Sequence, residues 1–118
     1  MHDQNIIHRD IKPKNIVFKD VEKTQVVIVD MGFATIGEEY KKIFYKCGTP
    51  GYVAPEILND LNYNYKVDVF SCGLILYKLL TGKAAFEGKC RRELMLKNKY
   101  GIVDVDSLKK RGVNGWVL

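Results

Sequence analysis

The chain has 118 residues, a net charge of +5, and 47% hydrophobic residues, which excludes a disordered tail and a collagen-like fibre. The lysines are scattered, and the densest basic cluster, Lys109–Arg111, is only three residues long. The charge therefore predicts a solvated surface, with neither nucleic acid nor a membrane as a partner.

Cysteine usage and hydropathy bear on the compartment. The cysteines Cys47, Cys72 and Cys90 are odd in number and form no C-x-x-C pair, which predicts reduced thiols and an intracellular, cytoplasmic protein. The polar start of the chain does not resemble a signal peptide. The longest apolar stretch, Val67–Leu80, is too short and too interrupted to span a bilayer.

Along the chain, the first clear pattern is a pair of β-branched runs, Ile16–Phe18 and Gln25–Val29, on either side of the charged stretch Lys19–Thr24. This pattern predicts a β-hairpin with a loop of about six residues. Residues Asp30–Pro55 lack a sustained period and predict a long ordered loop, of a length that is usually functional.

Helices are predicted after this loop. Pro55–Leu58 suits a short helix with proline in its first turn, and Lys66–Thr81 suits a longer one that ends at Gly82. The longer helix is apolar around nearly its whole circumference, which predicts burial on every side and more neighbours than a chain of this length supplies. A third, amphipathic helix is expected at about 87–99, with inward residues Leu94, Met95 and Leu96; the tail from Gly101 is weakly patterned.

The hairpin brings candidate metal ligands together. The residue that enters the first strand, Asn15, and the residue that leaves the second, Asp30, lie at the same end of an antiparallel pair. An amide oxygen beside a carboxylate suits Mg2+, and Asp10 and Lys12 lie just before Asn15. Taken singly, each residue is more simply a turn cap or a solvated charge; only the ordered combination favours chemistry.

Four segments carry a family resemblance. His8–Asn15 reads H-R-D-I-K-P-K-N, Asp30–Gly32 reads D-M-G, Gly48–Glu56 ends in A-P-E, and Asp68–Gly73 reads D-V-F-S-C-G. In this order and spacing they resemble the motifs of eukaryotic-type protein kinases. The lysine and proline of the first motif are similar to the serine/threonine branch, and the segment from Cys47 to Glu56 resembles the calmodulin-dependent group.

The resemblance implies an α+β, mainly helical fold: a partial large (C-terminal) lobe of a protein kinase, with a small hairpin that carries the catalytic and metal-binding loops. Residues 1–118 would be one partial kinase domain. It would contain a catalytic loop at 8–15, a metal-binding turn at 30–32 and an activation segment at 30–56.

The resemblance also implies catalytic roles. Asp10 would be the base that orients the substrate hydroxyl, and Lys12 would neutralise charge on the transferred phosphoryl group of ATP. The hydroxyl of Thr49 would lie near both. Arg9 is typical of kinases that pair it with an activation-loop phosphate, yet residues 36–48 contain no serine or threonine. We therefore expect no switch by Ser/Thr phosphorylation there; Tyr45 stands where a phosphorylated threonine is common.

The implied cofactors are ATP and Mg2+. Asn15 and Asp30 would hold Mg2+ against the ATP phosphates, and Val17 would lie under the adenine, although plain strand packing is an equally simple role for it. Lys78 stands where kinases that prefer basic substrates often have glutamate, which predicts a weaker preference for arginine two residues before the phosphorylation site.

Parts of the family pattern do not occur in the sequence. There is no G-x-G-x-x-G loop and no V-A-I-K lysine, so we expect the ATP-covering lobe before Met1 and the last helices after Leu118. Glu56 would then lack its usual arginine partner, and the chain alone would expose apolar patches and show negligible phosphotransfer.

The expected partners are protein substrates and ATP, and a regulatory protein would bind outside this segment. Two other hypotheses remain: a non-catalytic kinase-like binding or scaffolding module (a pseudokinase or truncated lobe), and a purely structural helical domain. The second leaves the charged constellation around Asp10 unexplained.

Overall fold

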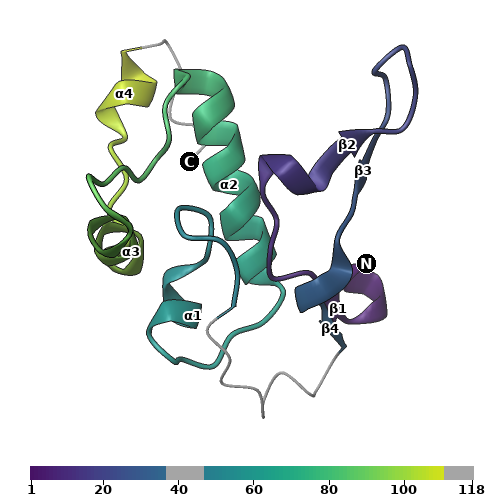
Figure 1. Ribbon diagram of the computed structural model, residues 1–118, viewed down its shortest axis with the longest axis horizontal. Helices are drawn as coiled ribbons and strands as arrows, with labels where there is room; N and C mark the ends of the chain where they lie inside the picture. Colours follow the sequence, from purple (N-terminus) through teal and green to yellow (C-terminus); the bar gives the residue numbers. More distant parts are fainter. Residues whose placement is uncertain (37–46, 111–118) are drawn as a thin grey trace.

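The computed structural model describes residues 1–36 and 47–110. In these residues, short helices and two small antiparallel sheets form an α+β fold, arranged around the long helix α2 (Lys66–Thr81). Figure 1 shows α2 standing between the hairpin formed by β2 and β3 on one side and the helices α3 and α4 on the other. No helix in the described ranges is long and apolar enough to cross a membrane.

The predicted hairpin is confirmed. β2 (Ile16–Phe18) pairs antiparallel with β3 (Val26–Ile28), with Ile16 opposite Ile28. The Asp20 carboxylate closes the connecting loop, because it accepts hydrogen bonds from the backbone N–H groups of Thr24 and Gln25 at 2.7 and 3.0 Å.

The expectation of an unbroken loop over 30–55 is wrong at its start. A 3-10 turn, η3 (Met31–Phe33), leads into β4 (Thr35–Ile36), which pairs with β1 (Ile6–Ile7). Strands of two residues have no period of their own and form only because the partner strand is present. Residues 37–46, which include Tyr45, lie outside the described residues.

The two helices that follow have the predicted bounds. α1 spans Pro55–Leu58, and α2 ends at Gly82, whose φ of 74° is the left-handed conformation of a helix C-cap. Within the described residues, α2 is not buried on every side: its exposed large hydrophobic residues are Val69, Leu76 and Leu79, at 56%, 43% and 77%. The expected exposed apolar surface is therefore present.

The predicted third helix begins later than expected. α3 spans Arg91–Tyr100, four residues after the expected start, because the chain folds tightly over its first turn: a Cβ at Gly88 would lie 2.5 Å from the backbone nitrogen of Leu94. The expectation that Leu96 points inward is also wrong, since it is 47% exposed. The fully buried residue of α3 is Asn98.

Three further short elements complete the described chain. The 3-10 turn η1 (His2–Gln4) precedes the segment 8–15, the 3-10 turn η2 (Pro13–Asn15) ends it, and α4 (Asp106–Lys109) follows α3. α4 packs against α2, where the Tyr77 hydroxyl donates to the backbone oxygen of Asp104 at 3.1 Å.

The core lies where α1 and α2 meet the segment before α1. Its buried cluster consists of Ile7, Val53, Ala54, Ile57, Leu58 and Val67. This cluster fixes the end of the activation segment against β1 and α2, and so positions residues 48–53 next to the catalytic loop.

Candidate active site

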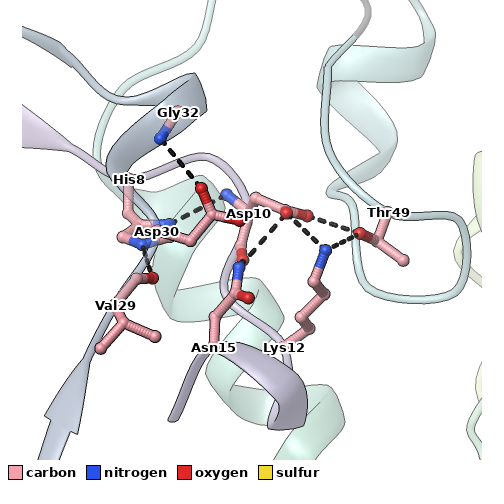
Figure 2. A network of polar contacts seen from close by, with 8 residues as sticks. All are labelled: His8, Asp10, Lys12, Asn15, Val29, Asp30, Gly32 and Thr49. Atoms are coloured by element: carbon pink, nitrogen blue, oxygen red, sulfur yellow. Dashed lines mark hydrogen bonds and ion pairs between the residues drawn. The ribbon is translucent and has the colours of Figure 1, made fainter.

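Asp10 forms a closed triangle of polar contacts with Lys12 and Thr49, shown in Figure 2. Its side chain is almost fully buried, at 4% exposure. The Thr49 hydroxyl donates to Asp10 Oδ1 at 2.6 Å, and Lys12 Nζ donates to Asp10 Oδ2 at 2.6 Å and to Thr49 Oγ1 at 2.8 Å. Asp10 and Thr49, which are 39 positions apart in the sequence, are thus brought together with Lys12, as predicted from the motifs.

Asn15 supports the same carboxylate from the other side. It is buried, and its side-chain amide donates to the backbone oxygen of Asp10 at 2.9 Å and to Oδ2 at 3.3 Å. Because the amide nitrogen is used in this way, the Asn15 side-chain oxygen is left to accept another bond or to bind a cation.

Asp30 is held at the same end of the hairpin. The Val29 N–H donates to the backbone oxygen of Asn15 at 2.9 Å, which places Asp30 one residue beyond this contact. Asp30 has a left-handed backbone with φ of 66°, and its side chain is bonded to the Gly32 N–H at 3.2 Å. Figure 2 shows it beside Asp10 and Asn15. An amide oxygen and an exposed carboxylate fit a hard cation that takes few protein ligands. The described residues hold no cluster of three or more histidine, cysteine or acidic side chains.

Two residues without predicted roles fix the catalytic loop. Asp68, 1% exposed, accepts the backbone N–H groups of His8 and Arg9, both at 2.8 Å, and the His2 ring nitrogen at 2.8 Å. His8 Nδ1 accepts the Asp10 N–H at 3.2 Å, so its Nε2 carries the proton that is donated to the Val29 oxygen at 3.1 Å. A buried ring thereby links the segment around Asp10 to the residue that precedes Asp30.

Arg9 has a strained left-handed backbone, with φ of 67°, immediately before Asp10. Its guanidinium donates to the backbone oxygen of Phe33 and, at 3.0 Å, to the Tyr63 hydroxyl. A tyrosine hydroxyl and a carbonyl thus occupy this side chain in the described structure. No sequence signal pointed to Tyr63; the single acid in the first turn of an apolar helix was the available signal for Asp68.

The segment that carries Thr49 is anchored on three sides. Gly48 has φ of 99°, and a Cβ there would lie 2.9 Å from the Arg9 carbonyl oxygen, so only glycine allows this approach. Ser71 donates to the Tyr52 oxygen at 2.8 Å. The Asn98 side chain donates a hydrogen bond to the Val53 backbone oxygen at 2.7 Å and accepts one from the Gly51 N–H at 2.8 Å.

Cys47, at the start of this segment, is buried, and burial raises the pKa of its thiol. Val17, the expected floor of the adenine pocket, lies on β2 and is 39% exposed. Its place leaves it open to a ligand, and its role stays a prediction.

A model of the protein kinase domain matches residues 1–113. The chain therefore belongs to the eukaryotic-type protein kinase family, as its four motifs predicted.

Among curated relatives, it is 39% identical over 114 residues to calcium-dependent protein kinase 4 of Plasmodium falciparum, covering 93% of this chain and 21% of that protein. It is 42% identical over 108 residues to the serine/threonine-protein kinase PLK1 of Xenopus laevis, covering 86% and 17%. It is also 49% identical over 86 residues to the putative serine/threonine-protein kinase/receptor R818 of Acanthamoeba polyphaga mimivirus, covering 73% and 5%. The chain spans about a fifth or less of these relatives.

Proposed function

We propose that this segment is the catalytic part of a serine/threonine protein kinase, which transfers the γ-phosphate of ATP to Ser/Thr hydroxyls of protein substrates. The observation that carries the proposal is the Asp10–Lys12–Thr49 triangle. A carboxylate and an ammonium already hold an aliphatic hydroxyl between them, at 2.6 and 2.8 Å. The serine/threonine kinases among its relatives support the same choice.

In the proposed reaction, Asp10 accepts the hydrogen bond of the substrate hydroxyl and takes its proton as the new O–P bond forms. The bond between the γ-phosphorus and the oxygen that bridges it to the β-phosphate breaks in the same step, and ADP leaves. An ionised carboxylate offers about four lone-pair positions, and the contacts with Thr49, Lys12 and Asn15 use three of them. One position on Oδ1 is left for the substrate hydroxyl. Lys12 neutralises negative charge on the phosphoryl oxygens while the phosphoryl group is transferred.

Asn15 and Asp30 would hold Mg2+, with ATP completing the coordination. When bound, Mg2+ would neutralise and orient the phosphates. Two other features keep the carboxylate of Asp10 fixed during the reaction: the buried His8 ring, and the Asp68 carboxylate under the loop. We infer that this preorganisation, rather than any covalent step, is what the segment contributes to the rate.

We also infer the substrate preference of the kinase from residues near Thr49, and its regulation from Thr35. Lys78 lines a cavity of 210 Å3 with residues of the segment after Thr49, including Pro50 and Tyr52. Its ammonium would disfavour an arginine side chain near the phosphorylation site, and a peptide library that strongly selects arginine two residues before that site would contradict this. Thr35 is buried and pairs with Ile7 in the sheet, which supports control without its phosphorylation.

The decisive experiment compares the chain alone with a fusion that joins it to an ATP-binding lobe, for example the lobe of the PLK1 relative. The chain alone, with ATP, Mg2+ and a protein substrate, is expected to give negligible turnover. The fusion is expected to label serine and threonine, and Asp10→Asn is expected to reduce its rate by several orders of magnitude. Labelling of tyrosine only, or full activity in Asp10→Asn, would overturn the proposal.

The alternative is a non-catalytic kinase-like binding or scaffolding module. The exposed apolar faces of α2 and the hairpin favour a role in binding. The intact Asp10, Lys12, Asn15 and Asp30 favour catalysis, because a scaffold has no need of these four polar groups around one buried carboxylate. A fusion that binds ATP but transfers no phosphate would support the scaffold. For the whole protein, we further propose a cytoplasmic location.

A further inference from the structure

A groove of 530 Å3 lies between α1 and α3, and none of the candidate active-site residues lines it. Its floor is apolar and its rim is basic. The lining residues are Leu58, Arg91, Arg92, Met95, Leu96 and Lys99.

The groove has the form of a stripe along α3. Arg91, Met95 and Lys99 follow one another at intervals of four residues, which places them on one face of the helix, about 12 Å from first to last. Met95 packs on the core cluster that contains Leu58, and Leu96 is 47% exposed beside it. An apolar strip is thus bounded by cations at both ends.

The three cations of the rim, Arg91, Arg92 and Lys99, form no ion pair with acidic residues in the described part of the chain. The ion pair of α3 joins Lys97 to Glu93 at 3.0 Å, whereas the three rim cations have no ion pair among the described residues. Arg91 and Arg92 also occupy the first turn of α3, where the helix dipole disfavours positive charge. The acid of that turn, Glu93, accepts the Lys89 N–H and pairs with Lys97, and it forms no ion pair with either arginine. Residues that break a local rule without local compensation are typical of functional surfaces.

We propose that this groove is a docking site for an acidic amphipathic segment of a partner protein. Leucine-type side chains of the segment enter over Met95 and Leu96, and its carboxylates pair with Arg91, Arg92 and Lys99. The volume accommodates a few aliphatic side chains, and the helix-in-groove mode gives such a segment both its apolar and its charged contacts. The charge complementarity selects an acidic partner rather than a neutral apolar one.

The inward face of α3 connects the groove to the active site. Asn98 bonds the backbone of Gly51 and Val53, close to Thr49 in sequence. A partner bound on the outer face therefore has a fixed position relative to the Asp10–Thr49 triangle. Docking in this groove does not require phosphotransfer, so a binding measurement tests it independently of the proposed kinase activity.

The test uses the full 118-residue chain and a fluorescent peptide in which two leucines, four positions apart, are flanked by glutamates. Anisotropy measures binding, and amide hydrogen exchange measures protection of α1 and α3. We expect saturable binding that weakens as salt is raised, with added protection in both helices. Arg91→Glu/Arg92→Glu should weaken binding roughly tenfold or more, since two attractive pairs become repulsive.

Matched controls separate this site from general charge. Lys19→Glu/Lys23→Glu in the hairpin loop makes the same change in net charge and should leave binding within a factor of two. A peptide with serine in place of leucine should bind roughly tenfold more weakly, as should the Leu96→Ser variant with the original peptide.

Several results would overturn the proposal. These are equal binding of the serine peptide or of a short RNA, an undiminished affinity in the arginine double variant, and self-association of the chain through this face. Unprotected α3 amides in the free chain would also overturn it, because the groove exists only while α1 and α3 pack together.

Discussion

Removing the carboxylate of Asp68 should loosen the catalytic loop more clearly than any other single change. Asp68 is 1% exposed and accepts two backbone N–H groups, those of His8 and Arg9, at 2.8 Å each. In Asp68→Asn the shape is kept, but one carboxylate oxygen becomes an NH2 group that faces a donor. One of the backbone N–H groups is then left buried without an acceptor.

The size of the effect follows from these contacts. A hydrogen bond to a charged group contributes about 1.5–3 kcal/mol, and an unsatisfied buried donor costs about 1–3 kcal/mol. A loss of about 3 kcal/mol in the free energy of loop opening corresponds to roughly 100-fold faster exchange of the two amides. The assay measures hydrogen exchange of the His8 and Arg9 amides, with NMR as the readout.

Asp106→Asn serves as the control, because Asp106 is exposed and only its 3.2 Å pair with Lys109 is lost. This change should alter the exchange of His8 and Arg9 by less than a factor of about two. Unchanged exchange of both amides in Asp68→Asn would refute the argument that this carboxylate holds the loop.

Three further predictions address the rest of the molecule. Asn98→Ala should destabilise the chain by about 2–3 kcal/mol in urea unfolding, because two backbone groups lose a buried partner; a change below 0.5 kcal/mol, on the order of a surface substitution, would contradict this. The Ser107 hydroxyl lowers the pKa of Asp104 from its ordinary value of 3.8, so the stability it gives α4 is present above that value and is lost as the pH falls through the lowered pKa. Ser107→Ala should raise the Asp104 pKa in an NMR titration, and no change would refute the assigned cause. Burial raises the pKa of the Cys47 thiol, so iodoacetamide at pH 8 should label it much more slowly than the exposed Cys90, and equal rates would show that the segment opens freely.

An element of the fold could be predicted from the sequence when its pattern lies within its own residues, and could not when a distant partner holds it in place. The hairpin and α2 carry local signals: two β-branched runs around a charged stretch, and a long apolar run that ends at Gly82. β2 and α2 have the predicted bounds, and β3 is one residue shorter at each end than the predicted run. β1, β4 and α4 carry no such signal, since each is held by a partner that is distant in the chain: Ile6 pairs with Ile36, and α4 lies against α2. The start of α3 was misplaced because tight folding at Gly88 is a tertiary constraint.

The same distinction applies to the site. The order and spacing of the motifs by themselves determined the family, as well as the residues to be considered, because Asp10, Lys12 and Asn15 share one short loop and the hairpin returns the chain to Asp30. Only the tertiary structure decided how these groups are held. It placed the Thr49 hydroxyl 2.6 Å from Asp10, Asp68 beneath the loop, and Asn98 behind the segment that carries Thr49. Such contacts join residues tens of positions apart, and a buried polar group finds its partner only when the packed elements bring the two together.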